Sequence, residues 1–150
     1  EFRRVLFRSI VSIKLVKESS IRYNPRKVTT PKDAYDLFES FLINSDREKF
    51  LVACFNIKNE PINISIVSIG TINSSLVHPR EVMKTAILSN SSSIMIAHNH
   101  PSGSITPSKE DENITKQLIN VCDMLGIKLL DHIIIGENKQ FFSFKENSLI

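Results

Sequence analysis

The sequence predicts one α/β domain with three layers, in which a mixed β-sheet is flanked by helices. The 150 residues, 41% of them hydrophobic, suffice for one full core. Short β-prone runs and segments with helical apolar spacing follow in the order strand, helix, two strands, helix, strand, helix, two strands. Such a mixture favours a mixed sheet with helices packed on its faces.

The first 28 residues are interpreted as lying outside the domain, which spans 29–150. Residues 1–9 match the translation of a common sequencing adapter, and we exclude them as a non-native scar. Without their three arginines and one glutamate, the net charge of +3 falls to about +1, which gives no argument for nucleic-acid binding. Residues 10–17 alternate, which predicts a half-buried edge strand, and 18–28 form a polar arm. Packing of this strand on its own domain is favoured over exchange with a second subunit.

Each element of the first half is predicted from a local signal. Thr30-Pro31 is typical of a helix start, because a hydroxyl N-cap precedes proline at the first helical position. Two apolar runs joined by a polar turn indicate a β-hairpin. The expected elements are a helix from Thr30-Pro31 to about Asn44, strands over 51–57 and 62–69, a loop over 70–75, a brief pairing at Leu76-Val77, and a helix from His78-Pro79 to about Asn90.

The second half begins with a short apolar run, 93–97, that predicts a buried central strand ended by Pro101 and Gly103. Thr106-Pro107 repeats the helix-start signal. The expected elements after it are a helix from Pro107 to about Leu125 with Gly126 at its C-cap, and strands over 129–135 and 141–144.

Potential metal ligands converge between this strand and this helix. His98 and His100 are two apart on a strand end and point the same way, whereas Asn99 points away. Ser108 and Asp111 are three apart near the helix start and share a face. If the loop folds back, two imidazoles and a carboxylate meet with a hydroxyl alongside. Three protein ligands plus one open position are typical of a catalytic zinc site, so we predict that His98, His100 and Asp111 bind Zn²⁺. The alternative for the histidines is a solvated strand end without a metal.

The same residues resemble a known family. His98-x-His100 and, further on, Ser108-x-x-Asp111 resemble the JAMM metallopeptidase motif of JAB/MPN domains. The stretch 98–108 holds the strings His-Asn-His-Pro-Ser-Gly and Thr-Pro-Ser, which look like the RadC branch of that superfamily. The resemblance runs from the first predicted helix to the C-terminus. It implies a fold related to cytidine deaminases and a metal-dependent hydrolase of peptide or isopeptide bonds, with an unidentified peptide or protein substrate.

The resemblance also implies roles beside the metal ligands. Glu48 holds the place of the JAMM glutamate that acts as general base, and its alternative is an exposed carboxylate at the start of a strand. Ser108 matches the serine that hydrogen-bonds the developing oxyanion, and its alternative is an early-helix serine that satisfies the backbone. Glu60 and Glu81 are weaker rivals for the base.

Two other functions remain open at this point. RadC proteins are named for DNA repair, and full-length members resemble this chain with an added N-terminal helix-hairpin-helix module that we expect it to lack. A DNA-associated accessory protein is therefore the second hypothesis, although the slight basic charge supports it weakly. An inactive metal-bearing scaffold is the third, and the intact ligand set argues against it.

Several classes of enzyme do not fit the residues. A zinc deaminase needs His-x-Glu and a later Cys-x-x-Cys, and a zincin needs His-Glu-x-x-His. Pro101-Ser102 stand where a metallo-β-lactamase motif would continue, and the contiguous His-Asn-His is not the dispersed motif of HNH nucleases.

The remaining polar and cysteine residues are assigned structural roles. Asp131 and His132 are neighbours on a strand and face opposite ways; a hydrogen-bonded core role is favoured for both over contact with a metal ligand. His78 is interpreted as a residue at a helix start. Cys54 and Cys122 are expected to be reduced core residues of a cytoplasmic protein. No apolar run approaches the roughly 20 residues of a membrane helix, and no signal peptide is visible.

Overall fold

A mixed five-stranded sheet forms the centre of the computed structural model, which describes residues 8–23, 26–70 and 77–150. Its strands are β1 (Glu48–Phe55), β2 (Pro61–Gly70), β3 (Ser93–Asn99), β4 (Lys128–Ile135) and β5 (Phe141–Ser143). They lie in the order β2-β1-β3-β4-β5, with β3 and β4 parallel and the other neighbouring pairs antiparallel. The predicted mixed sheet is therefore confirmed.

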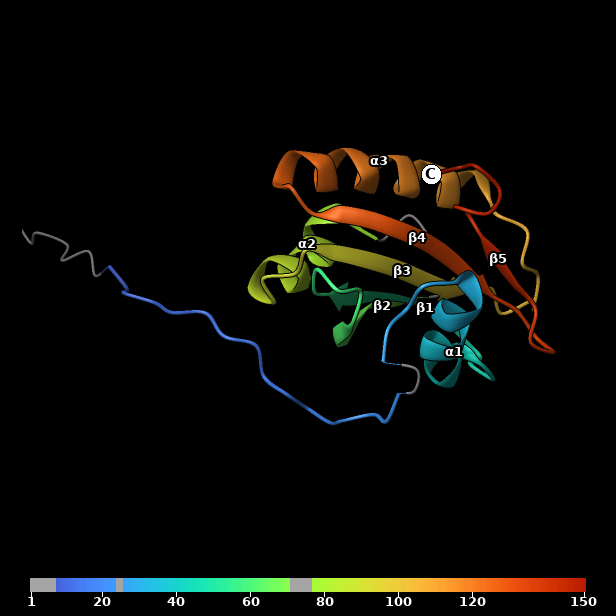
Figure 1. Cartoon of the computed structure of the whole chain (residues 1–150), viewed down its shortest axis with the longest axis horizontal. Helices are drawn as coiled ribbons and strands as arrows, with labels where there is room; N and C mark the ends of the chain where they lie inside the picture. Colours follow the sequence, from blue (N-terminus) through green and yellow to red (C-terminus); the bar gives the residue numbers. More distant parts are fainter. Residues whose placement is uncertain (1–7, 24–25, 71–76) are drawn as a thin grey trace, which may run out of the picture.

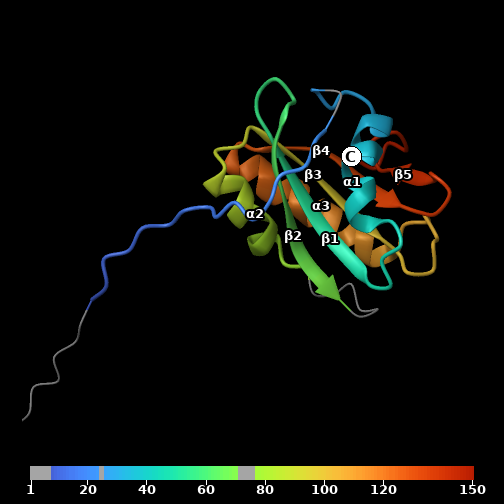
Figure 2. The same cartoon turned by 90° about the horizontal axis from the view of Figure 1, so that it is seen from below.

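Helices cover both faces of this sheet. α1 (Pro31–Leu42) lies on one face, whereas α2 (Pro79–Leu88) and α3 (Lys109–Leu125) lie on the other (Figure 1, Figure 2). Each face has its own apolar cluster, one under α1 and one under α2 and α3. The three layers confirm the predicted fold class.

The central strands are buried on both faces. Along β1, Leu51 and Phe55 enter the cluster under α1, whereas Phe50 and Cys54 enter the cluster under α2 and α3. Successive side chains of a strand point to opposite faces, so a strand with helices on both sides must be apolar at nearly every position. This explains the unbroken apolar run that predicted a buried strand.

α1 begins where the sequence predicts. Thr30 Oγ1 accepts a hydrogen bond from the Asp33 backbone N–H (3.1 Å), and the Asp33 carboxylate accepts one from the Thr30 backbone N–H (2.9 Å), which makes a capping box. Pro31 follows the cap. Hydrogen bonds from Thr29 and then Thr30 hold the pKa of Asp33 below its ordinary value. The helix ends at the C-cap Ile43.

α3 begins two residues later than predicted, because its N-cap is Ser108 and not Thr106. Ser108 Oγ accepts from the Asp111 N–H (3.1 Å), and Asp111 Oδ2 accepts from the Ser108 N–H (2.7 Å). A capping box needs an acceptor three residues after the cap; Ser108 has Asp111 there, whereas Thr106 has Lys109. The helix ends as predicted at Gly126, whose left-handed conformation (φ 67°) suits glycine.

Residues 10–17 form no strand, which contradicts the predicted edge strand. Their side chains are exposed, and the segment leads away from the body of the molecule (Figure 1, Figure 2). Alternation alone does not hold a strand, which needs a hydrogen-bonded neighbour, and none of the described strands pairs with this segment. Contact begins further on, where the Tyr23 hydroxyl donates to the Asp33 carbonyl oxygen (2.9 Å) and the Val28 N–H donates to the Asn59 carbonyl oxygen (3.0 Å).

Smaller predictions have mixed outcomes. Cys54 and Cys122 are free and buried, as expected of core residues. None of the described helices is long and apolar enough to cross a membrane. Leu76, the loop over 71–75 and the first seven residues of the predicted scar lie outside the described residues, whereas Val77, the second residue of the predicted brief pairing, is described and lies in no strand.

Candidate metal centre

The three predicted ligands meet at the carboxyl end of β3. His98 lies near the end of β3 and His100 directly follows it, while Asp111 lies in the first turn of α3. The chain leaves β3, passes through a loop, and returns along α3 before it enters the parallel strand β4. Crevices at the carboxyl ends of parallel strands are common ligand sites in α/β proteins.

Four potential ligand atoms converge there. His98 Nε2 lies 3.0 Å from His100 Nε2 and 3.2 Å from Asp111 Oδ1, and His100 Nε2 lies 3.2 Å from Asp111 Oδ2. One ligand atom from each residue fits within 4.8 Å of the other two. The predicted convergence is therefore present, and the loop folds back as the sequence suggested.

Asp111 both caps a helix and faces the histidines. Its Oδ2 accepts the Ser108 N–H, which fixes the carboxylate at the N-terminus of α3, where the helix dipole favours negative charge. Burial pushes the pKa of Asp111 upward, but the adjacent imidazoles of His100 and His98 outweigh it and hold that pKa well below its ordinary value. The carboxylate is thus an anion in a buried position.

His100 presents its Nε2 to the cluster. Its Nδ1 lies 2.9 Å from the Ser104 carbonyl oxygen, which can only accept, so Nδ1 carries the proton and Nε2 keeps its lone pair. In the charged ring, Nε2 also carries a hydrogen and donates it to the Asp111 carboxylate, which raises the pKa of His100, although burial opposes it. The centre therefore attracts positive charge.

The donor set fits a divalent metal ion. Two imidazole nitrogens and a carboxylate oxygen are the ligands of many catalytic zinc sites, and they also suit other first-row metals. His98 and Asp111 are buried, whereas His100 is half-buried, so solvent reaches the cluster from the His100 side. The ring of Phe50 stacks on His98 with centroids 6.0 Å apart and makes that wall apolar.

Glu48 lies at the start of β1, beside the cluster. Phe50 pairs with His98 across β1 and β3, and Glu48 is two residues earlier on the same face of the sheet. Burial raises the pKa of Glu48, with His98 and His100 acting to lower it, so its carboxylate is within electrostatic reach of the centre. Glu48 is half-buried and not the fully exposed carboxylate of the alternative interpretation.

Asn99 holds the backbone on both sides of Glu48, a role that the sequence analysis missed. Its Oδ1 accepts from the Lys49 N–H (2.9 Å), and its Nδ2 donates to the Arg47 carbonyl oxygen (3.0 Å). The residue between the predicted ligands therefore fixes the strand start that carries the predicted base. In the sequence, the only indication of this role is that Asn99 lies between His98 and His100 and points to the opposite face of the sheet.

Ser108 lies beside Asp111 as predicted, but its geometry serves two purposes. Its Oγ accepts the Asp111 N–H, which is the backbone role of the alternative interpretation. Within the described residues, its hydroxyl hydrogen has no acceptor, so it is free to donate. The oxyanion role of Ser108 stays a prediction.

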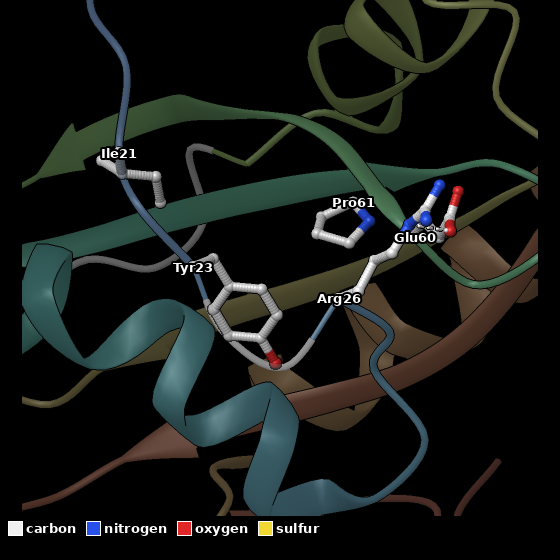
Figure 3. A pocket seen from close by; sticks show the side chains of 5 residues that line it. All are labelled: Ile21, Tyr23, Arg26, Glu60 and Pro61. Atoms are coloured by element: carbon white, nitrogen blue, oxygen red, sulfur yellow. Dashed lines mark ion pairs between the residues drawn. The ribbon is translucent and has the colours of Figure 1, made fainter.

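The rival carboxylates are engaged elsewhere. Glu60 lies at the hairpin turn, at the opposite end of β1 from Glu48, where its Oε1 lies 2.6 Å from Arg26 Nε. Figure 3 shows this pair in a pocket of about 410 Å³ that the arm forms with β2, lined also by Ile21, Tyr23 and Pro61. Glu81 lies in the first turn of α2 and pairs with Lys84 (2.9 Å).

Asp131 and His132 lie on opposite faces of β4, as predicted, and both are buried. The Asp131 carboxylate accepts from Ser143 Oγ (2.6 Å) and the Lys145 N–H (3.0 Å), the core role expected for it. His132 departs from that expectation, because its Nε2 lies 2.8 Å from His98 Nδ1. Burial lowers the pKa of His132 well below its ordinary value.

Thr115 was also missed by the sequence analysis, although a signal for it exists. It follows Asp111 by four residues, which places both on one face of α3. Its Oγ1 lies 2.6 Å from the Asp111 carbonyl oxygen and 2.6 Å from His132 Nδ1. Thr115 therefore joins α3 to β4 behind the metal centre.

Comparisons with known proteins give similar sequences over most of the chain. A family model described as RadC-like JAB domain matches residues 28–149. A UPF0758 protein of Rubrobacter xylanophilus is 41% identical over 94% of this chain and 62% of its own length. UPF0758 proteins of Clostridioides difficile and Staphylococcus carnosus are 49% and 51% identical, over 83% and 75% of this chain and 52% and 50% of their own lengths. The chain thus spans about half of such relatives or slightly more, and their names state no activity.

Proposed function

This chain belongs to the RadC-like JAB domain family, and on that premise we propose that it is a zinc-dependent hydrolase of peptide or isopeptide bonds. The observation that carries the proposal is the convergence of His98 Nε2, His100 Nε2 and the Asp111 carboxylate, with His100 partly exposed to solvent. His98, His100 and Asp111 would hold the ion. A bound divalent zinc ion polarises a substrate carbonyl and lowers the pKa of water.

The chain's own residues supply the remaining chemistry. Glu48 takes a proton from the attacking water at a carboxylate oxygen and later gives it to the leaving amine. The backbone contacts of Asn99 hold Glu48 in place. The free hydroxyl hydrogen of Ser108 donates to the oxygen that gains negative charge. The Ser108 N–H holds the Asp111 carboxylate in place, and the stacked Phe50 ring holds His98 from an apolar side.

The first experiment measures metal content. Elemental analysis of the purified protein should find about one zinc per chain, and His98→Ala or Asp111→Ala should remove it, because a three-ligand site does not survive the loss of one ligand. Full metal occupancy in both variants would reject the assignment. A different metal in the native protein would correct the ion and leave the ligand set in place.

The second experiment measures cleavage of a peptide and isopeptide library. Glu48→Gln is nearly isosteric and is expected to keep zinc and the fold but to lose about 10²–10⁴-fold in rate, because an amide cannot accept the proton. Ser108→Ala is expected to cost about 10²–10³-fold, the usual effect of removing one oxyanion donor. Cleavage that persists unchanged in Glu48→Gln would reject Glu48 as the base. Glu60→Gln is the matched control and should cleave like the native protein, since Glu60 pairs with Arg26.

The same assay separates the enzyme from the accessory protein. Single-stranded and duplex DNA are tested in parallel with the peptides. Salt-sensitive DNA binding without cleavage of any peptide would favour the DNA-associated function. Zinc binding without cleavage or DNA binding would favour the inactive scaffold.

A further inference from the structure

A chain of hydrogen bonds runs behind the metal centre and ends on one of its ligands. It starts at the Asp111 carbonyl oxygen, passes through the Thr115 hydroxyl and the His132 ring, and reaches His98 Nδ1. All four residues are buried. Because each atom in the chain has few ways to share its hydrogen, the position of every proton can be worked out.

The Thr115 hydroxyl has its only hydrogen committed. A carbonyl oxygen has no hydrogen to give, so two oxygens 2.6 Å apart require that Thr115 Oγ1 donates to the Asp111 carbonyl. Thr115 Oγ1 must then accept from its other partner. That partner is His132 Nδ1, also at 2.6 Å, so His132 carries a hydrogen on Nδ1.

The His132 ring is neutral in this arrangement. It is completely buried, and its two nitrogens face a hydroxyl and another imidazole, neither of which is an anion. A buried cation without an anionic partner is costly. With its hydrogen on Nδ1, the neutral ring has a bare Nε2 that can only accept.

The last bond fixes His98. His132 Nε2 accepts, so His98 Nδ1 must donate across the 2.8 Å that separates them. A neutral His98 then carries no hydrogen on Nε2, the atom that faces His100 and Asp111. We propose that Thr115 and His132 are positioning residues that select the tautomer of His98 able to bind a metal ion. This inference rests on the proposed metal site.

The opposite tautomer shows why such a device is useful. His98 Nε2 lies 3.2 Å from Asp111 Oδ1, so a hydrogen on Nε2 would be donated to that oxygen and the satisfied pair would exclude the metal. That state would require a bare His132 Nδ1 facing Thr115 Oγ1, whose hydrogen is already used. Two acceptors 2.6 Å apart repel, so the buried hydrogen bonds of Thr115 and His132 disfavour the metal-excluding state. The Phe144 ring stacks on His132 with centroids 4.5 Å apart and holds the His132 ring in place within this relay of hydrogen bonds from Asp111 to His98.

The test compares two substitutions of Thr115. Thr115→Val keeps the shape but removes the hydroxyl, so His132 is free to move its hydrogen to Nε2 and donate to His98. Zinc affinity, measured by competition with a chelating indicator, should fall about 10–100-fold, the usual effect of losing a group that orients a metal ligand. Thr115→Ser keeps the hydroxyl and should restore affinity to within a few-fold of native. Ser91→Ala removes another buried hydroxyl that donates to a backbone carbonyl, far from the relay, and should bind zinc like the native protein.

A second readout does not depend on metal. In the metal-free protein at mildly alkaline pH, ¹⁵N NMR of the imidazoles should place the His98 hydrogen on Nδ1 in the native chain and in Thr115→Ser, and partly on Nε2 in Thr115→Val. A native His98 protonated on Nε2, or a Thr115→Val variant that binds zinc as tightly as native, would overturn the inference. If the native protein shows the Nδ1 tautomer but binds no zinc, the metal site fails and the tautomer assignment stands.

Discussion

At the scale of single residues, Asn99 gives the stretch His98-Asn99-His100 a structural role in addition to its predicted metal ligands. A strand end would normally leave the Arg47 carbonyl and the Lys49 N–H to water. The Asn99 amide satisfies both, because it offers one donor and one acceptor at the spacing of two backbone groups. The predicted ligands His98 and His100 point to the opposite side, so the same three-residue stretch would serve both the metal and the predicted base.

We expect Asn99→Ala to impair hydrolysis without removing the metal. The substitution leaves two partly buried backbone groups without a partner, which costs about 1–3 kcal/mol for each group that water does not reach. Glu48 then loses its fixed position, so kcat falls while zinc content is unchanged. Urea unfolding, zinc analysis and peptide cleavage together check this. Asn63→Ala is the control, because the Asn63 amide donates to Ser89 Oγ (2.8 Å) and pairs with Cys54, at the other end of β1 from Glu48; equal kcat losses in both variants would count against a specific role for Asn99.

At the scale of elements, the two Thr-Pro pairs show how far local signals reach. Thr30-Pro31 starts α1, but Thr106-Pro107 does not start α3. The difference is the acceptor three residues after the cap, which Thr30 has in Asp33 and Thr106 lacks. For these two helices, the complete capping box marks the start, whereas the Thr-Pro pair alone does not.

The α1 capping box predicts a stability change with a defined pH dependence. Asp33→Ala removes the carboxylate that accepts hydrogen bonds from the Thr29 and Thr30 backbone N–H groups, so it should destabilise the protein by about 0.5–1.5 kcal/mol near neutral pH. Hydrogen bonds lower the pKa of Asp33 in the folded state, so its contribution is present above the unfolded pKa and is lost as pH falls through the folded pKa. The difference between native and variant should therefore shrink in acid, as measured by urea unfolding at several pH values.

Asp36→Ala is the matched control for that comparison. Asp36 lies in the same helix and pairs with Lys32 at the surface. An exposed pair of this kind contributes little, so the variant should stay within about 0.5 kcal/mol of native at neutral pH. An Asp33→Ala variant that resembles Asp36→Ala at every pH would show that the capping box does not stabilise α1.

The parts that sequence reasoning missed depend on partners distant in the chain. The alternation in residues 10–17 resembles a strand, yet strand formation needs a neighbour, and periodicity does not show whether one is present. His132 was recognised as a buried strand residue, but its contact with His98 exists because β4 lies parallel to β3. The predicted ligands His98, His100 and Asp111 could be grouped from the sequence because they lie on either side of one loop.

At the scale of the whole molecule, the candidate metal centre lies between two layers, the sheet and the helix layer that contains α3. His98 and His100 belong to the sheet, Asp111 belongs to α3, and the relay through Thr115 and His132 returns to β4. An ion held by these ligands would tie the sheet to the helix layer. Because an unfolded chain does not hold the three ligands together, metal binding should stabilise the folded state.

Zinc should therefore raise the melting temperature, and a chelator should reverse the change. At free zinc about 100-fold above Kd, linkage predicts about 2.7 kcal/mol of added stability, which corresponds to a shift on the order of 5–10 °C for a chain of this size. His98→Ala and Asp111→Ala should show no such shift. His78→Ala is the matched histidine control: His78 is the N-cap of α2 but makes no side-chain cap hydrogen bond, so this variant should keep the full shift. A zinc shift that survives in His98→Ala but disappears in His78→Ala would place the ion elsewhere, because binding at the β3–α3 centre requires His98 and leaves His78 uninvolved.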